Sequence, residues 1–546
     1  MTTYPELLYL RIYLSRRKMI FSTKPVICNR KRICRQLFPV YVIIASLVIA
    51  SCAQPAVEYL PRVFVKPVTI RIDNSVVYQD IEGFGATTRA SVMYTGNGLK
   101  DLLEPSLRQQ AIDAVYGQAG LTMGNLEFWM EPVNDDGNPF TYNWKGFMLS
   151  GPDTMYRLLV QPALEAGFDN YSLGLKIDMR RHLAWLKPLR NTDYRRYLDE
   201  ISEFVTAGMI YWRDKSGFTP RYISLFNEPL SGNRELRGGD VNEVIDIIIH
   251  AGDRLRSEGF AEVLFIVPGE ETVEKSLRTA EAILADDRAR KYVGAISYHA
   301  YPYHSSYSSI RRILQKSGAG EPEPEEIRIR NELKQLGEKY NIPVWMTEIS
   351  EGPGNAEYEF GADENLRARA IHIHDELVHA NASAFFGMNN MWDRRIHEAH
   401  FKNRNVGFFT ESSSIALIDQ DASEVYISGM GYAIGHYARW IKRGAVRIDA
   451  MTDDSHIQVS AFRDDAAGRL VAVIINNNDD NREINVLLDN IRIGSPVTGE
   501  QSAEGLRWDR ITGFAPGAPD RMRLNMLPLS VMTVSAPIQV NQRGYD

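Results

Sequence analysis

From about residue 80 to residue 443, short apolar segments rich in β-branched and aromatic residues alternate with longer segments whose apolar residues recur every three or four positions. The short segments have the pattern of buried strands, and the longer ones have the pattern of amphipathic helices. Such alternation is typical of a parallel sheet built from strand–helix units. Eight strands are predicted: Ile81–Thr87, Leu121–Trp129, Ser172–Ile177, Tyr222–Phe226, Val263–Val267, Ala295–Tyr298, Val344–Thr347 and Ala384–Met388.

The longer segments predict helices that cover these strands. In Asp240–Glu258, Val241, Val244, Ile245 and Ile248 fall on one helical face. Eight strands, each followed by a helix, predict a (β/α)8 barrel over residues 79–443, with the chain beyond the usual ~250 residues placed in loops. A doubly wound open sheet is the alternative. Further helices are predicted near residues 104–118, 193–213, 276–290, 325–340, 364–380 and 426–442.

After Gly444 the pattern changes to strands of period two separated by turn residues. This pattern predicts a small β-sandwich over residues 444–537, joined by an N-terminal strand within residues 68–78. Residues 53–67 are interpreted as a linker and residues 538–546 as a tail. The C-terminal strands are predicted at Val446–Asp449, Gln458–Arg463, Leu470–Asn476, Glu483–Leu488 and Leu529–Ala536.

The first 52 residues have the pattern of a targeting segment. A basic stretch precedes the apolar run Leu37–Ala50, whose 14 residues fall short of the roughly 20 needed to span a bilayer. The run ends in Ile49-Ala50-Ser51-Cys52, which resembles a bacterial lipobox. We therefore expect an exported lipoprotein anchored in the outer membrane through a lipid on Cys52. A plain secretory signal with an incidental cysteine is the alternative.

Composition and charge narrow the function classes. Hydrophobic residues make up 44% and charged residues 24% of the chain, as in ordinary globular proteins. The net charge is −7 although residues 1–52 hold nine Lys and Arg against one Glu, so the remainder is acidic and unsuited to binding nucleic acid. The cysteines Cys28, Cys34 and Cys52 all precede residue 53, which excludes a disulfide or thiolate metal site in the body.

Motifs for metal, nucleotide and serine chemistry are missing from the sequence. It contains no HExxH pair, P-loop, GxGxxG after the first strand or GxSxG elbow. We therefore expect neither a cofactor nor a catalytic metal. Two carboxylates attract attention instead, because Glu228 follows the fourth predicted strand and Glu348 follows the seventh.

Catalytic side chains in barrels of this kind stand at the C-terminal ends of strands. Glycosidic cleavage requires two carboxyl groups in one cleft, one to protonate the leaving oxygen and one to attack the anomeric carbon. A single glutamate at such a position is more often an exposed loop residue. Two glutamates, each after a strongly apolar strand, favour a catalytic role. A retaining mechanism further predicts that the carboxyl groups of Glu228 and Glu348 lie about 5–5.5 Å apart.

At this point the sequence resembles glycoside hydrolase family 30, within the clan A retaining β-glycosidases. The resemblance covers about residues 68–537, and its motifs are specific in combination although each alone is weak. They are Gly83-Phe84-Gly85-Ala86, Asn227-Glu228-Pro229, Thr347-Glu348, Trp392 and the segment from Gly431 through His436 to Ile448.

The resemblance implies that Glu228 is the acid/base and Glu348 the nucleophile. It also implies that Asn227 hydrogen-bonds the substrate 2-hydroxyl group. His299 and Tyr301 would line the site and orient the nucleophile, although a lone histidine at a strand end is often only structural.

Trp392 would form an apolar platform under a sugar ring, whose C–H faces stack on aromatic groups. The alternative is a core tryptophan at the barrel rim. The family usually carries an arginine after the second strand, yet residues 125–131 contain none. Either Arg89 replaces it or the subsite is built differently.

The segment 394–404 is unusually basic for an acidic chain, and its cations include Arg394 and Arg395. Such a run is most often a solvated face. It would alternatively bind a carboxylate or sulfate group on the glycan, for which the planar guanidinium group is well suited.

These observations predict a monomeric enzyme that cleaves a β-linked polysaccharide or oligosaccharide with retention, with endo action preferred over exo action. The rival hypothesis is a glycan-binding lipoprotein without catalytic activity, because a fold does not fix a function. A binding protein has no need of both Glu228 and Glu348, so the pair favours the enzyme.

Overall fold

The computed structural model describes most of the chain after the N-terminal segment. Cys52 and the rest of residues 1–66 lie outside the described residues. Within the described part, no helix is long and apolar enough to cross a membrane. The described residues are 67–88, 92–95, 98–101, 104–127, 131–132, 136–168, 170–175, 177, 179, 183–217, 219–231, 236, 239–301, 324–349, 362–393, 413–511 and 518–539.

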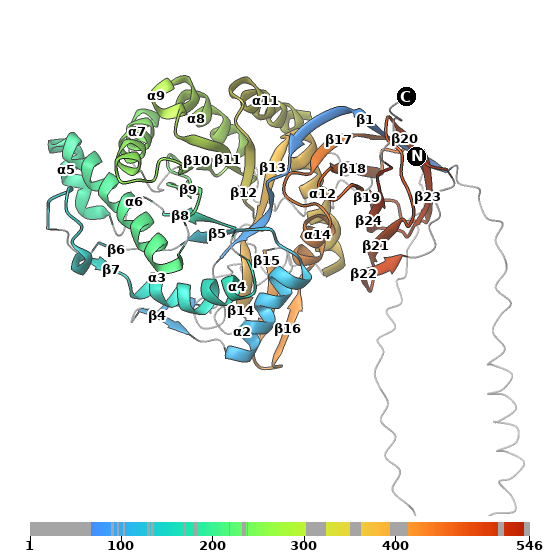
Figure 1. Cartoon of the computed structure of the whole chain (residues 1–546), viewed down its shortest axis with the longest axis horizontal. Coiled ribbons are helices and arrows are strands. Elements are labelled where there is room, and N and C mark those ends of the chain that lie inside the picture. The colour runs from blue at the N-terminus through green and yellow to red at the C-terminus, as the bar shows by residue number, and fades with distance from the viewer. Residues whose placement is uncertain are drawn as a thin grey trace, which may run out of the picture. The chain divides into compact units, whose positions relative to one another are not determined.

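Eight parallel strands form a closed barrel in which each strand pairs with its neighbours in chain order and the last pairs with the first (Figure 1). Each overlaps one of the eight predicted strands, so the predicted barrel is confirmed and the open sheet is wrong. The strands are β2 (Gly83–Thr87), β5 (Met123–Glu127), β8 (Tyr171–Gly174), β9 (Tyr222–Ser224), β10 (Leu264–Glu270), β11 (Val293–His299), β12 (Val344–Glu348) and β13 (Ala382–Gly387).

Helices surround the barrel strands (Figure 1). The start of α7 is fixed by a side-chain cap. The side chain of Asp240 accepts hydrogen bonds from the backbone N–H groups of Asn242 and Glu243 in the first turn of this helix. The helices are α2 (Pro105–Ile112), α3 (Ser150–Met155), α4 (Gln161–Glu165), α5 (Lys187–Thr192), α6 (Tyr194–Ser216), α7 (Val241–Ser257), α8 (Val273–Ala285), α9 (Asp287–Arg290), α11 (Pro324–Tyr340), α12 (Ala362–His379) and α14 (Gly429–Ala438).

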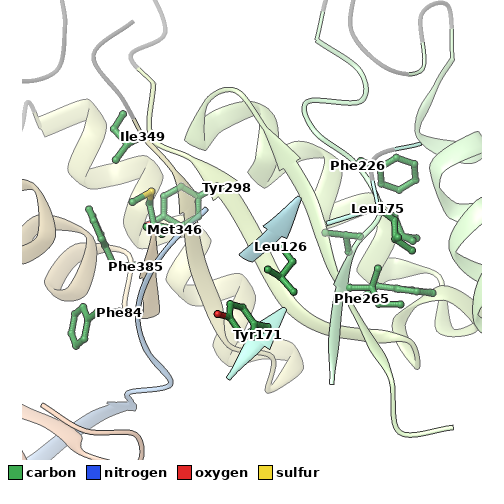
Figure 2. Close-up of a cluster of buried hydrophobic side chains, with 14 of the residues drawn as sticks. Phe84, Leu126, Tyr171, Leu175, Phe226, Phe265, Tyr298, Met346, Ile349 and Phe385 are labelled. Carbon is green, nitrogen blue, oxygen red and sulfur yellow. The ribbon is translucent and has the colours of Figure 1, made fainter. Parts of the chain in front are cut away.

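The side chains of the barrel strands point alternately outward and inward. In β12, Val344 and Met346 join the large apolar cluster that packs between strands and helices, part of which Figure 2 shows. Trp345, between them, joins a separate small cluster with Tyr222 and Phe386. The strands are therefore buried on both faces, which explains why their sequences are almost continuously apolar.

The C-terminal strands form a sheet in which hydrogen bonding runs through nine strands, in the order β22-β21-β24-β19-β18-β17-β1-β20-β23. The predicted N-terminal strand is β1, which pairs with β17 and β20. These strands are β1 (Val68–Asp80), β17 (Val446–Thr452), β18 (Ile457–Asp464), β19 (Arg469–Asn476), β20 (Arg482–Asp489), β21 (Thr498–Ala503), β22 (Leu506–Ile511), β23 (Arg521–Met526) and β24 (Ser530–Pro537).

This sheet folds into two layers. Ile70 of β1 and Val486 of β20 belong to the same buried cluster as Val459 of β18 and Ile474 of β19. The opposite face of β19 packs through Val473 into the cluster of the barrel. The sheet therefore forms the predicted β-sandwich, and its inner layer covers the barrel helices.

Several short strands that were not predicted lie in the loops of the barrel. A three-stranded sheet follows the last barrel strand, and two hairpins lie in the loops after the first and second strands. They are β14 (Asn389–Asp393), β15 (Ser414–Asp419), β16 (Glu424–Ile427), β3 (Val92–Thr95), β4 (Gly98–Asp101), β6 (Glu131–Pro132) and β7 (Phe147–Met148).

Candidate active site

Glu348 and His299 end two neighbouring strands of the barrel. The pairing of β11 with β12 aligns Tyr298 with Met346 and then His299 with Glu348, so Thr347 is an extra residue in β12. An extra residue of this kind bends a strand locally and redirects the side chains that follow it. His299 and Glu348 thereby lie side by side at the C-terminal edge of the barrel.

Glu228 stands just after β9 in a backbone conformation that is unusual for a residue with a side chain. Its φ is 56°, in the left-handed region, which costs a non-glycine residue about 1–3 kcal/mol. The N–H of Glu228 donates a hydrogen bond of 2.8 Å to the carbonyl oxygen of Gly269, at the end of β10. Such a strained conformation persists only where the surrounding structure enforces it, and residues of this kind cluster at functional sites.

Glu228, His299 and Glu348 meet in a buried cluster, with 3%, 4% and 7% of their surfaces exposed. Nδ1 of His299 lies 3.1 Å from Oε1 of Glu228 and 4.0 Å from Oε1 of Glu348. One carboxylate oxygen from each glutamate and a ring nitrogen of His299 all lie within 4.8 Å of one another. This spacing fits the short carboxyl separation of retaining glycosidases and is below the ~6.5–9.5 Å of inverting ones.

The same three side chains have the spacing of a possible metal site. They offer a nitrogen and two carboxylate oxygens, a mixed donor set that suits zinc and other transition metals. A glutamate acid paired with a glutamate nucleophile would account for the two carboxylates without a metal, with His299 as their neighbour.

Tyr301 contacts the second glutamate. Its hydroxyl donates a hydrogen bond of 3.1 Å to Oε1 of Glu348, and its ring lies edge-on to the His299 ring at 6.2 Å. The resemblance implied that both residues orient the nucleophile. The structure places Tyr301 on Glu348, whereas His299 is closer to Glu228.

A cavity lies at this end of the barrel, with about 440 Å³ of empty space that is partly open to solvent. Its walls combine aromatic side chains with small polar ones, the mixture that suits a sugar. The lining residues are Asn125, Ser172, Gly174, Ser224, Phe226, Asn227, Ile266, His299, Trp345, Thr347, Glu348 and Phe386.

Not every predicted site residue reaches this cavity. Trp392 lies in β14, pairs with Leu417 of β15, and is only 5% exposed. Like Glu228 and Tyr301, it is not among the residues that line the cavity, and its role as a platform stays a prediction. Arg89, Arg394, Arg395 and Cys52 lie outside the described residues.

Two polar features of the site were missed in the sequence. Asn125, in the middle of the second barrel strand, lines the cavity and accepts a hydrogen bond of 3.3 Å from the hydroxyl of Ser172. Glu270, at the end of the fifth strand, is 1% exposed. The predicted fifth strand ended at Val267, before Pro268 and Gly269, which hid the third carboxylate at a strand end.

Two comparisons relate the chain to known proteins. No protein-family model matches the chain. It is 25% identical over 447 residues to putative glucosylceramidase 2 of Caenorhabditis elegans, covering 74% of this chain and 76% of that protein. It is 22% identical over 312 residues to glucuronoxylanase XynC of Bacillus subtilis, covering 56% of this chain and 57% of that protein.

The structure is similar to the catalytic domain of the family 30 xylanase C from Talaromyces cellulolyticus, with a TM-score of 0.62 at 17% identity. The match covers 86% of this chain and all of that domain. The fold is therefore that of glycoside hydrolase family 30, a barrel with a side β-sandwich. The resemblance that the sequence indicated is confirmed.

Proposed function

We propose that the protein is a retaining glycoside hydrolase that cleaves the interior of a β-linked polysaccharide. The observation that carries the proposal is the buried pair Glu228 and Glu348, which come from the ends of different strands and face one another within 4.8 Å. A glycan-binding protein would not need two carboxyl groups at this separation, so the pair favours catalysis.

We give each carboxyl group the role that the resemblance to family 30 implies, with Glu228 as the acid/base and Glu348 as the nucleophile. The Glu348 carboxylate attacks the anomeric carbon while Glu228 donates its proton to the departing glycosidic oxygen, which leaves the sugar esterified to Glu348. Glu228 then takes a proton from water as the water oxygen attacks the same carbon and releases Glu348. Tyr301 holds the attacking carboxylate through its hydrogen bond, and Asn227 lines the cavity where a 2-hydroxyl group would lie.

The names of the relatives support a β-glycosidic substrate, but they indicate two different classes of substrate. One relative is named a glucuronoxylanase and the other a putative glucosylceramidase. The polymer is preferred here, and exo action on short β-glycosides is the alternative.

A screen of residues 53–546 against a panel of polysaccharides, with the products measured by mass and by anomeric NMR, tests this proposal. We expect oligosaccharides of several lengths early in the reaction, with the β configuration kept at the new reducing end.

Single sugars released from the start would favour exo action. An α product would overturn retention, and no product from any glycan would return the protein to the glycan-binding class.

A finer part of the proposal concerns the substrate's charge. The basic segment 394–404 directly follows β14, and the glucuronoxylanase relative acts on a uronic acid-bearing xylan by its name. We therefore propose that Arg394 and Arg395 bind an acidic substituent of the glycan.

We also propose that the mature chain begins at Cys52 and is anchored by a lipid on that residue. The support is the apolar run Leu37–Ala50 followed by Ala50-Ser51-Cys52. Mass spectrometry of the N-terminal peptide from a bacterial expression host is expected to find a diacylglyceryl thioether on Cys52. Cys52→Ser is expected to leave the protein out of the membrane fraction. An unmodified Cys52, or cleavage elsewhere, would favour the plain secretory signal.

A further inference from the structure

A third glutamate, Glu270, braces the loop that carries Glu228. Oε1 of Glu270 accepts a hydrogen bond of 3.0 Å from the backbone N–H of Leu230, and Oε2 accepts one of 2.9 Å from the hydroxyl of Ser231. Both donors lie within three residues of Glu228. The two oxygens of one buried carboxylate thus hold the backbone and a side chain of the same turn.

The end of β10 is shaped for this contact. The pairing of β10 with β11 aligns Pro268 with Ser297 and then Glu270 with Tyr298, so Gly269 is an extra residue that redirects Glu270. Gly269 has a φ of 67°, which a residue with a Cβ atom rarely adopts. Its carbonyl oxygen accepts the N–H of Glu228 at 2.8 Å.

Glu228 is therefore held on both sides by consecutive residues of the neighbouring strand. Gly269 binds its own N–H, and Glu270 binds the residues that follow it. The Glu228 carbonyl oxygen also accepts the N–H of Ser231 at 3.2 Å, which closes the turn. These bonds supply the outside support that the left-handed conformation of Glu228 requires.

We infer that Glu270 is a positioning residue, which fixes the backbone turn of Glu228 and so aims the proton of the acid/base at the glycosidic oxygen. The inference rests on the proposed function. A displacement of about 1 Å is enough to cost on the order of 100-fold in rate, because proton transfer requires hydrogen-bond distance.

Charge gives Glu270 a second influence on the same residue. Burial raises the pKa of Glu270, the two hydrogen bonds and the nearby His299 oppose that rise, and the charge of Glu228 adds to it. Repulsion between two carboxylates is mutual, so an ionised Glu270 disfavours ionisation of Glu228. Glu228 also faces His299, at 3.1 Å, and Glu348, and Glu270→Gln leaves both of these groups in place. A general acid must enter the reaction protonated, so this repulsion would extend its working range toward higher pH.

Kinetics on two aryl glycosides test the inference. A 2,4-dinitrophenyl glycoside leaves without protonation, whereas the unsubstituted phenyl glycoside of the same sugar needs the acid. For Glu270→Gln we expect kcat/KM to fall by about 10- to 100-fold on the phenyl glycoside and by less than about 3-fold on the dinitrophenyl one. The alkaline limb of the pH profile should move to lower pH, because the repulsive charge is gone.

Ser231→Ala is a milder variant that removes one of the two hydrogen bonds to Glu270. It should show the same selectivity between the two glycosides with a smaller loss of kcat/KM. This variant keeps the test decisive if Glu270→Gln does not fold.

Glu243→Gln is the matched control. Glu243 is a buried glutamate of α7, 5% exposed, whose Oε1 accepts a hydrogen bond of 2.6 Å from Tyr197. We expect its substitution to lower the melting temperature and to leave the ratio of the two kcat/KM values unchanged.

Equal losses on both glycosides with an unmoved pH limb, in both site variants, would overturn the inference and make Glu270 a purely structural residue. Full activity of Glu270→Gln on the phenyl glycoside would also overturn it. The proposed function fails separately, if the wild-type protein cleaves no glycan or if Glu228→Gln is as active as wild type.

Discussion

The phenol of Tyr301 donates its hydrogen bond to Oε1 of Glu348, the same oxygen that lies 4.0 Å from Nδ1 of His299. A donor at this place favours the charged form of the carboxylate and fixes its orientation. The structure thus gives the two proposed catalytic glutamates separate neighbours, with Tyr301 on Glu348 and His299 closer to Glu228.

Tyr301→Phe keeps the ring and removes the hydrogen bond. Hydrogen bonds to charged groups contribute about 1.5–3 kcal/mol, so we expect kcat/KM to fall by about 10- to 150-fold. The loss should appear equally on phenyl and 2,4-dinitrophenyl glycosides, because the attack of Glu348 is common to both. Steady-state kinetics of the two substrates measure it. A loss confined to the phenyl glycoside would instead place Tyr301 on the acid.

Glu228→Gln and Glu348→Gln should fail in different ways. Glu228→Gln lacks the proton donor, so natural glycans should lose at least about 100-fold in kcat while the dinitrophenyl glycoside still forms the glycosyl-enzyme. Added azide, which attacks without a general base, should restore its turnover. Glu348→Gln should lose both substrates, and azide should not restore the retained product. Natural-glycan activity equal to wild type in either variant would reject the assignment.

The eight barrel strands and the meeting of Glu228 and Glu348 in one buried cluster could be predicted because both leave a local signal. Each strand is a short apolar run, and Glu228 and Glu348 are the first carboxylates after two of them. Glu270 is also the first carboxylate after its predicted strand, but it stands farther from the apolar run. Pro268 and Gly269 interrupt the run before it, and only the pairing of β10 with β11 reveals that the strand continues through an extra residue.

The β-sandwich was predicted less completely for a similar reason. β21 reads Thr498-Gly499-Glu500-Gln501-Ser502-Ala503, which contains little apolar surface, yet most of it is buried. Its polar groups are satisfied by partners distant in sequence: Glu500 accepts from the Trp440 indole at 2.7 Å, and Ser502 bonds to His436. A hydrophobic pattern cannot indicate a strand whose burial depends on such pairs.

His436 joins the last barrel helix to two strands of the β-sandwich. The Thr533 hydroxyl donates its proton to the carbonyl oxygen of His436. Its oxygen must therefore accept a hydrogen bond from Nδ1–H of the His436 ring, 2.9 Å away. The Ser502 hydroxyl accepts the N–H of Trp508 and lies 2.9 Å from Nε2, to which it can donate its own proton. Burial lowers the pKa of His436 to about 3, so the imidazole is neutral, and the network accommodates this form.

This neutral histidine should make stability depend on pH. In the unfolded chain it takes up a proton below about pH 6.5, whereas in the folded chain it does not until about pH 3, so stability is lost as pH falls through that window. At pH 5 we expect the wild type to have lost about 2 kcal/mol more than His436→Gln, relative to pH 7.5. Urea unfolding at the two pH values measures this difference. The half-exposed His456→Gln is the control, and an identical pH dependence in wild type and His436→Gln would contradict the prediction.

Gly435, in the same helix, lies against the indole ring of Trp508, and a Cβ atom built there would overlap the ring. Trp508 is held in place because its indole N–H donates to the carbonyl oxygen of Tyr432 at 3.1 Å. Gly435→Ala should therefore destabilise the protein by about 1–3 kcal/mol, measured by thermal or urea unfolding. In a Trp508→Ala background the same substitution should cost far less. Equal costs in both backgrounds would show that the ring is not the obstacle.

The basic segment 394–404 makes a prediction about substrate charge. If Arg394 or Arg395 meets an acidic substituent in the cleft, each charge-assisted contact should contribute about 1.5–3 kcal/mol, more than an exposed ion pair would. Arg394→Ala or Arg395→Ala should then lower kcat/KM by about 10- to 150-fold on a uronic acid-bearing or sulfated glycan and leave the desubstituted glycan nearly unchanged. Equal effects on both glycans would make the segment a solvated surface and leave selectivity to the neutral cavity wall around Asn125 and Ser172.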